Sequence, residues 1–240
     1  NIINFYNKIN VHGNSDSSIN LDEYCSVMNK YQFEGDGTEF HHYYYNKLNG
    51  NGPPSKACIS KLTKELATYN SALPMNIESS IYVRYNRDNF QNLKALIIGP
   101  KDTPYENGCY IFDIYIPKNY PSEPPKVNLQ TTGYGTVRFN PNLYNCGKVC
   151  LSLLGTWSGE DGEKWNPNTS TLLQVLVSIQ SLIFVENPYF NEPGYEKSMH
   201  TQDGKNANFK YNDERRLENI KWGINDNINN PAPEFKDVII

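Results

Sequence analysis

Thiols are the side chains of this sequence best suited to covalent chemistry. The chain has five cysteines: Cys25, Cys58, Cys109, Cys146 and Cys150. The last two lie in a segment, residues 133–165, that shows neither strand nor helix periodicity. A long irregular segment inside a compact domain is usually functional, and the ring and apolar content of this one argues against disorder. We therefore expect a functional loop with a free thiol available as a nucleophile.

Metal binding and disulfide formation are the alternatives for Cys146 and Cys150. No second cysteine pair and no nearby histidine completes a zinc set, so the sequence predicts no metal site. An odd cysteine count in a 240-residue chain is unlike a secreted disulfide framework, which favours a reducing compartment, the cytoplasm or the nucleus. Cys146 is interpreted as an incidental surface thiol, with oxidation onto Cys150 as the alternative.

The segment around Cys150 resembles the active-site segment of ubiquitin-conjugating enzymes. Asn140-Pro141-Asn142 is followed by Cys150 eight positions after Asn142, where the family usually has His-Pro-Asn and a cysteine at that spacing. Three segments and one dipeptide match further family motifs in the same order: residues 99–108, residues 120–127, Trp165-Asn166-Pro167 and Asn187-Pro188. Residues 138–145, 157–164 and 187–196 are similar to the branch of large apoptosis-inhibiting conjugating enzymes. That resemblance implies that this chain is the catalytic end of a larger protein.

The resemblance implies a thioester mechanism. Cys150 would accept the activated carboxyl group of ubiquitin, and Asn142 would stabilise the oxyanion that forms during transfer or order the loop that does so. Asn191 or Glu192 would position the acceptor lysine. From the residue types alone, Cys150 also fits a small buried apolar position, Asn142 a turn, and Glu192 a helix N-terminus. Asn140, in place of the usual histidine, puts loop rigidity in doubt more than the chemistry.

The same resemblance implies surfaces for two partner proteins. Lys56, Lys61 and Lys64 resemble the helix face that docks the ubiquitin-activating enzyme, although a solvated helix face explains them equally well. Four residues correspond to the loops that face a ubiquitin ligase: Ser122, Glu123, Trp165 and Pro167. The family usually has a large apolar side chain where this chain has Ser122 and Glu123, so we expect weaker recruitment of ordinary ligases and a built-in ligase activity. ATP is expected to be used by the activating enzyme, so no cofactor is expected on this chain.

The sequence on both sides of this loop shows the periodic patterns of strands and helices. Strands are predicted over residues 81–85, 93–98, 110–116 and 127–129, and helices over 21–28, 55–69, 172–183, 195–211 and 213–229. Ile59, Leu62, Leu66 and Tyr69 form the predicted apolar stripe of the second helix, and Leu182 belongs to that of the third. The pattern predicts an α+β fold, an antiparallel meander of about four strands flanked by helices, which is also the fold that the resemblance implies.

A break rich in Asn, Gly and Pro at residues 49–54 divides the chain. We predict an N-terminal extension over residues 1–55, with a loop at 10–20, and a catalytic domain over residues 56–240. Hydrophobic residues make up 38% of the chain and charged residues 20%, which is enough to bury a core. The net charge of −4 argues against general nucleic-acid binding, and neither a membrane-spanning run nor a secretory leader is visible.

Three other functions compete with ubiquitin transfer to a lysine of a protein substrate. The first is an inactive member of the same fold that serves as a scaffold or binding module. The second is a carrier of another ubiquitin-like modifier. The third is a thiol hydrolase, which needs a histidine beside the nucleophile, whereas His12, His41, His42 and His200 are all remote from Cys150 in sequence.

Overall fold

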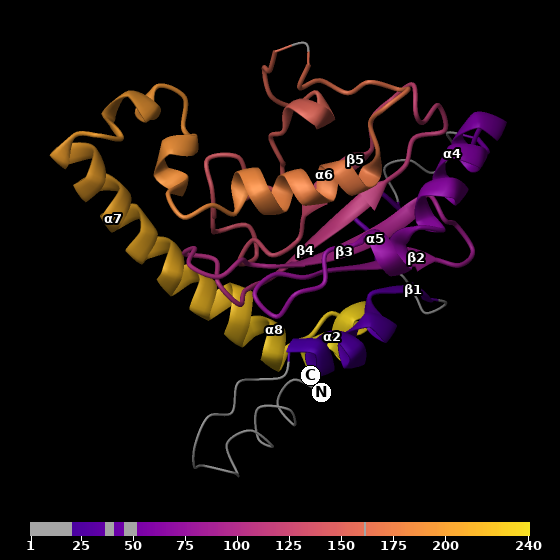
Figure 1. The fold of residues 1–240 in the computed structure, drawn as a ribbon, viewed down its shortest axis with the longest axis horizontal. Coiled ribbons are helices and arrows are strands. Elements are labelled where there is room, and N and C mark those ends of the chain that lie inside the picture. The colour runs from indigo at the N-terminus through magenta and orange to yellow at the C-terminus, as the bar shows by residue number, and fades with distance from the viewer. Residues whose placement is uncertain (1–20, 37–40, 46–51, 161) are drawn as a thin grey trace, which may run out of the picture.

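The computed structural model describes residues 21–36, 41–45, 52–160 and 162–240, and its centre is a five-stranded sheet (Figure 1). The strands are β1 (Phe33–Asp36), β2 (Ile81–Asn86), β3 (Asn92–Ile98), β4 (Cys109–Tyr115) and β5 (Lys126–Leu129), in that order across the sheet. Strands β2 to β5 form the predicted antiparallel meander. The expected loop at residues 10–20 lies outside the described residues.

Strand β1 and helix α9 (Lys236–Ile239) were not predicted from the sequence pattern, and β1 is the one that changes the sheet. It pairs in parallel with β2, so part of the region before residue 55 joins the sheet. Its sequence, FEGD, has little intrinsic strand preference. Tertiary contacts hold it in place, since the Phe33 ring packs against Tyr69 and Tyr85 at centroid distances of 5.4 and 5.2 Å. At Gly35 a Cβ atom would lie 2.7 Å from the Tyr85 ring, so any other residue there would have to displace that ring.

The helices surround this sheet. They are α2 (Leu21–Met28), α4 (Lys56–Leu66), α5 (Tyr69–Ala72), α6 (Leu172–Ser178), α7 (Gln202–Glu218), α8 (Asp226–Asn229) and α9 (Lys236–Ile239). Helix α4 begins where predicted because the Ser55 side chain accepts a hydrogen bond from the Cys58 amide. The prediction that Ile59 faces the core was wrong: Ile59 is 42% exposed, and Cys58 is buried in its place.

The two helices predicted over residues 195–211 and 213–229 are wrong in their boundary. Residues 202–229 form one continuous helical segment, in which a π-helical stretch, Asn219–Asn225, joins α7 to α8. Thr201 caps its start by accepting a hydrogen bond from the Gly204 amide. Asn212, at the predicted break, is buried and donates to the Glu186 carbonyl, so it lies inside the helix and packs against the segment after α6.

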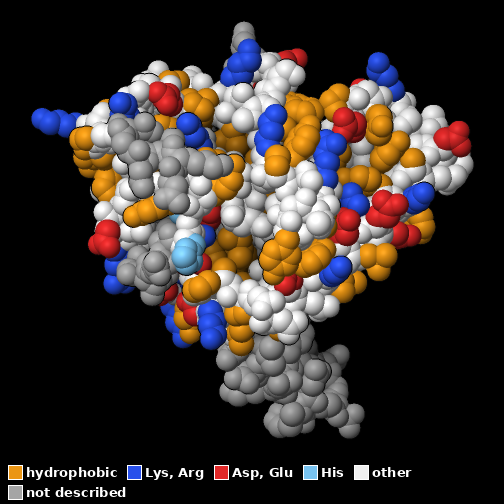
Figure 2. All heavy atoms as spheres, turned by 180° about the vertical axis from the view of Figure 1, so that it is seen from behind, with side chains coloured by type: hydrophobic (Ala, Val, Ile, Leu, Met, Phe, Trp, Pro, Cys, Tyr) orange, Lys and Arg blue, Asp and Glu red, His pale blue; other side chains and the backbone are white. Residues whose placement is uncertain are grey.

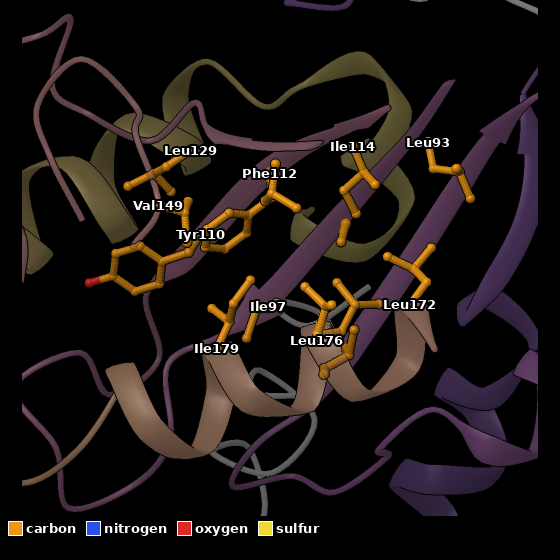
Figure 3. Packing of buried hydrophobic residues seen from close by; sticks show 14 of the residues in the cluster. Leu93, Ile97, Tyr110, Phe112, Ile114, Leu129, Val149, Leu172, Leu176 and Ile179 are labelled. Carbon is orange, nitrogen blue, oxygen red and sulfur yellow. The ribbon is translucent and has the colours of Figure 1, made fainter. Parts of the chain in front are cut away.

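The inner face of the sheet carries the main hydrophobic core. Helix α6 lies along this face, and the side chains of Leu172, Leu176 and Ile179 point toward strand residues such as Ile97 and Phe112 (Figure 3). A π-helical turn, Ile179–Ile183, continues α6. It leaves Leu182 60% exposed, against the prediction that this residue faces the core.

The outer face of the sheet is covered by the two ends of the described chain, α2 and the segment with α9 (Figure 1). Three neighbouring strand residues, Arg84, Lys94 and Asp113, bury charged groups there. The ammonium of Lys94 contacts Asp113 at 2.8 Å and Glu234 at 3.6 Å. Seen from behind, Lys and Arg side chains are interspersed with Asp and Glu over the described surface (Figure 2).

Candidate active site

Cys150 lies at the end of a short hairpin that follows β5. Leu143 and Val149 form an antiparallel bridge, and the Cys150 amide donates to the Asn142 carbonyl at 2.9 Å. Toward the turn, the Tyr144 amide donates to the Lys148 carbonyl at 3.0 Å. Across this hairpin, Asn142 therefore faces Cys150, Leu143 faces Val149, and Tyr144 faces Lys148. Because side chains alternate between faces, the buried pair 143/149 points one way and the other two pairs point together the other way.

The thiol of Cys150 lines a groove of about 680 Å³. The opposite walls come from the insert after the active-site strand and from the end of the α6 segment, with Trp157, Leu182 and Asn191 among the lining residues. Cys150 is only 2% exposed, and burial raises the pKa of its thiol, while the positive charges of Lys148 and Arg138 oppose that rise. A thiol in this setting is reachable from the groove but largely screened from bulk water.

Asn142 is directed at the backbone of Cys150. Its Nδ2 donates to the Cys150 carbonyl at 2.9 Å, and its own amide donates to Asn140 Oδ1 at 2.8 Å. Asn142 is therefore held by two hydrogen bonds: its backbone N–H bonds the Asn140 side chain, and its side chain bonds the backbone of Cys150. An amide has two N–H donors, so the second one remains able to bond an oxygen at the groove.

Asn140, which stands where the family usually has histidine, is fully buried and ties the loop to its surroundings. Its Nδ2 donates to the Tyr105 hydroxyl at 3.0 Å and to the Ile183 carbonyl at 2.8 Å. With the bond from Asn142 to its Oδ1, this one side chain joins the active-site turn, the segment before β4 and the end of α6. Asn191 Nδ2 also donates to Asn140 Oδ1 at 3.4 Å, so the short side chain that replaces the usual histidine makes four hydrogen bonds around the active-site loop.

Thr156 is a supporting residue that sequence reasoning missed. Its hydroxyl donates to the Val149 carbonyl at 2.7 Å and accepts from the Leu151 amide at 3.0 Å, so it bonds the residues on both sides of Cys150. A single threonine outside every motif gives no sequence signal of this role. Thr156 can support the active site only because the loop that contains it folds back across the strand that carries Cys150.

Of the two predicted acceptor-side residues, Asn191 ends the short 3₁₀ helix Pro188–Asn191 and Glu192 follows it. Asn191 lines the groove, and its Nδ2 donates to the Leu182 carbonyl at 3.1 Å. Glu192 instead turns toward Arg138, with 3.4 Å between Arg138 Nη2 and Glu192 Oε2. Glu192 follows this helix at its C-terminal end and precedes the next 3₁₀ helix, Tyr195–Ser198, whose first amide donates to its carbonyl at 3.1 Å, so the alternative of an N-terminal helix charge stays a prediction.

A stack of two cations and a ring lies at the other edge of Cys150. The Arg138 guanidinium is 4.2 Å from the centre of the Tyr144 ring, and the Lys148 ammonium is 5.5 Å from it. Arg138 also donates to the Pro141 carbonyl at 2.6 Å, inside the active-site turn. We call Arg138, Tyr144 and Lys148 the cationic stack. Neither Arg138 nor Lys148 was among the predicted site residues.

The three predicted docking lysines lie on α4 but differ in their surroundings. Lys56 and Lys64 are exposed, whereas Lys61 is half-buried and pairs with Glu65 at 3.3 Å. Glu65 in turn accepts from the Tyr120 hydroxyl at 2.7 Å and from the Leu172 amide at 2.9 Å, the first amide of α6. The face therefore has two exposed cations and a third that helps hold α4 to α6.

The residues predicted to face a ligase come together in space. Trp165 Nε1 donates to the Pro121 carbonyl at 2.6 Å, which fixes the two loops side by side. Ser122, Glu123 and Pro167 are all exposed on these loops.

The thiol-hydrolase alternative lacks its base in the part of the chain that the structure describes. No histidine is among the residues that line the groove of Cys150. His42 is buried on the outer face of the sheet, and His41 and His200 are exposed elsewhere. Among the described residues there is also no group of three potential metal ligands and no helix long and apolar enough to cross a membrane.

Comparison with known proteins identifies the family. The family described as ubiquitin-conjugating enzyme matches residues 61–217. The chain is 48% identical over 230 residues to the dual E2 ubiquitin-conjugating enzyme/E3 ubiquitin-protein ligase BIRC6 of Homo sapiens, covering 91% of this chain and 5% of that protein. It is 50% identical over 192 residues to the probable ubiquitin-conjugating enzyme protein 17 of Caenorhabditis elegans, covering 80% of this chain and 26% of the relative.

A mimiviral relative, the probable ubiquitin-conjugating enzyme E2 R521 of Acanthamoeba polyphaga mimivirus, is 47% identical over 184 residues, covering 77% of this chain and 13% of that protein. The chain thus spans only a small part of the relatives it matches. The predicted resemblance is confirmed, and with the fold and the groove of Cys150 it leads to one statement: the chain belongs to the ubiquitin-conjugating enzymes.

Proposed function

We propose that Cys150 carries ubiquitin as a thioester and passes it to a lysine of a protein substrate. The observation that carries this is the placement of the thiol in the groove, on a hairpin held by Asn140, Asn142 and Thr156. We propose that the groove of about 680 Å³ holds the extended carboxyl-terminal tail of the carried ubiquitin. Ubiquitin, the activating enzyme and the protein substrate are the partners of this step, and ATP is used on the activating enzyme.

Transfer exchanges a thioester for an amide. The acceptor amine forms a bond to the carbonyl carbon, the carbon–sulfur bond breaks, Cys150 leaves as a thiolate, and the amine proton passes to solvent. Negative charge appears on the carbonyl oxygen, and the amide of Asn142 is the donor at hand. Because the pKa of the Cys150 thiol is raised, its thiolate is a poorer leaving group than an ordinary one, which favours a thioester that persists until an amine arrives.

For partner docking we propose that Lys56 and Lys64 meet the activating enzyme, with Lys61 mainly structural. The joined loops of Pro121 and Trp165 present Ser122, Glu123 and Pro167 to a ligase surface. Ser122 and Glu123 are polar and are therefore poor anchors for an apolar ligase pocket. The name of one relative combines E2 and E3 activities. A built-in ligase activity of the whole protein is therefore part of the proposal.

A charging assay tests the proposal. The 240-residue chain is incubated with activating enzyme, ubiquitin and ATP, and the products are run on a non-reducing gel. Cys25 lies in the extension, and its thiol contacts the Met75 carbonyl. Wild type and the control Cys25→Ser should both give a thiol-sensitive band one ubiquitin heavier. Cys150→Ser should lose the band or replace it with a thiol-resistant ester. A thiol-sensitive band in Cys150→Ser would refute the assignment, and charging only with another ubiquitin-like modifier would support the carrier alternative.

A further inference from the structure

We propose that the cationic stack of Arg138, Tyr144 and Lys148 selects acceptor lysines that have an acidic residue close by in the substrate. This inference rests on the proposed transfer chemistry and adds a substrate class to it. The occupant of this surface is an extended acidic segment that flanks the lysine.

The position of the stack is set by the hairpin. Lys148 is two residues before Cys150 on one arm, and Tyr144 is two residues after Asn142 on the other. Residues two apart on a strand point to the same face and lie about 6.6 Å apart. A substrate in extended conformation has the same repeat. When its lysine reaches Cys150, a side chain two residues away therefore lies over the stack.

The charge of the stack is positive and fixed. Arg138 is held by its bond to the Pro141 carbonyl, its contact with the Tyr144 ring and its pairing with Glu192. The side chain of Arg138 is still 42% exposed, and Lys148 is exposed on the turn. Arg138 pairs with a partly exposed carboxylate, that of Glu192, at 3.4 Å. The local charge is therefore positive in a chain whose net charge is −4, which marks this edge as complementary to an acidic ligand.

The two sides of the thiol have different roles in this arrangement. The groove, with Trp157, Leu182 and Asn191, lies on one side of Cys150, and the stack is not among its lining residues. A carried ubiquitin tail in the groove would leave the stack open to the acceptor. Arg138 links the two sides, because it bonds the active-site turn and also pairs with Glu192, the neighbour of Asn191.

Single-turnover discharge of the ubiquitin-charged 240-residue chain tests the proposal. Three lysine peptides are compared: one with Glu two residues after the lysine, one with Gln there, and one with Glu eight residues away. At low salt the first should react about fivefold faster than the other two, the size expected for one exposed ion pair. The preference should shrink in 1 M salt, where charges are screened within about 3 Å.

Variants of the chain distinguish an effect of the cationic stack from an effect of the overall charge of the protein. Lys148→Gln and Arg138→Gln should bring the rate ratio of the Glu and Gln peptides close to one. Lys148→Glu should reverse the preference in favour of a peptide with Arg in place of the Glu. The matched control is Lys30→Gln, because Lys30 is an exposed lysine over the ring of Tyr31 at 4.7 Å, in the extension. This control should keep the full preference.

The outcomes separate this proposal from the proposed function. Equal rates on the Glu and Gln peptides by wild type, with normal discharge onto free lysine, would overturn the acidic preference and leave the transfer chemistry standing. A preference that survives in both stack variants would also overturn it. Failure of wild type to form the thioester would overturn the transfer chemistry and this inference with it.

Discussion

The two faces of the sheet are closed by different forces. The inner face packs apolar side chains of α6, such as Leu176, against the strands and so supports the hairpin of Cys150. The outer face combines a smaller apolar cluster, which includes Phe235, with the buried charges of Arg84, Lys94 and Asp113. Hydrophobic burial is insensitive to pH and weakly sensitive to salt, whereas buried charges depend on keeping every partner.

The two faces also differ in how much of them lies within residues 61–217, the range that matches the family. Most of the inner core and the active-site loop lie within that range. The outer cover includes α2, His42 and the segment of Glu234 and Asp237, which lie outside that range. These outer segments are held by hydrogen bonds and ion pairs as well as by apolar contact.

The largest expected effect comes from breaking the outer charge cluster. Asp113→Ala removes the 2.8 Å partner of Lys94 and the acceptor of the Tyr43 amide, and leaves a buried ammonium with Glu234 at 3.6 Å. The free energy of unfolding should fall by about 3–5 kcal/mol, measured by urea denaturation. The double variant Lys94→Met, Asp113→Leu should recover part of this loss, because the buried ammonium is removed together with its 2.8 Å partner, whereas Glu234 then loses its contact with Lys94. A double variant as unstable as Asp113→Ala would contradict this account.

On the inner side, the strongest polar test is Asn140→Ala. It leaves the Asn142 amide and the Ile183 carbonyl without their partner in a buried site, so stability should fall by about 2–4 kcal/mol. The charging rate should fall with it, because Asn142 loses its anchor. Asn140→His, which restores the usual family residue, is the matched control and should charge faster than Asn140→Ala. Equal charging by wild type and Asn140→Ala would show that the anchor does not matter for the chemistry.

The sequence predicted the inner side far better than the outer side. The strands from β2 to β5 have alternating or continuous apolar patterns, and the motifs with Cys150 and Asn142 have fixed spacing, so both are local signals. Strand β1 carries no such signal, since its pairing depends on the distant rings of Tyr69 and Tyr85.

Other features were missed for the same physical reason. The pairing of Arg138 with Glu192 joins residues 54 positions apart, and only the folded chain brings them together. The predicted helices over residues 195–211 and 213–229 left a break at Asn212. In the structure the buried Nδ2 of Asn212 donates to the Glu186 carbonyl at 2.8 Å, which no local pattern reveals.

The pH dependence of the free energy of unfolding tests the contribution of His42, which is buried on the outer face of the sheet. Its Nε2 contacts the carbonyls of Leu93 and Ile114 at 3.0 and 3.1 Å, and its Nδ1 accepts from the Tyr44 amide, which requires the neutral ring. Burial lowers the pKa of His42 below 6.5, with the Asp113 charge as the main opposing effect. The unfolded chain therefore binds a proton that the folded chain does not, so stability is present above about pH 6.5 and is lost as the pH falls below it.

The measurement is urea denaturation at pH 7.5, 6.5 and 5.5. The loss of stability between the first and the last should be smaller in His42→Gln than in wild type. His41→Gln, at the exposed neighbouring position, should keep the wild-type slope. Parallel slopes in wild type and His42→Gln would assign the acid sensitivity to other groups.

The smallest expected effect concerns Cys146, the second thiol of the active-site hairpin. Cys146 is exposed at the turn, whereas Cys150 is buried, and both are free. Since the fixed hairpin holds Cys150 toward the groove, mild hydrogen peroxide should reduce charging equally in wild type and Cys146→Ser. The measurement is the initial charging rate after peroxide treatment, with and without a reductant. Protection by Cys146→Ser would instead show that the two thiols oxidise onto each other, and that the hairpin opens far enough to let Cys150 leave the groove.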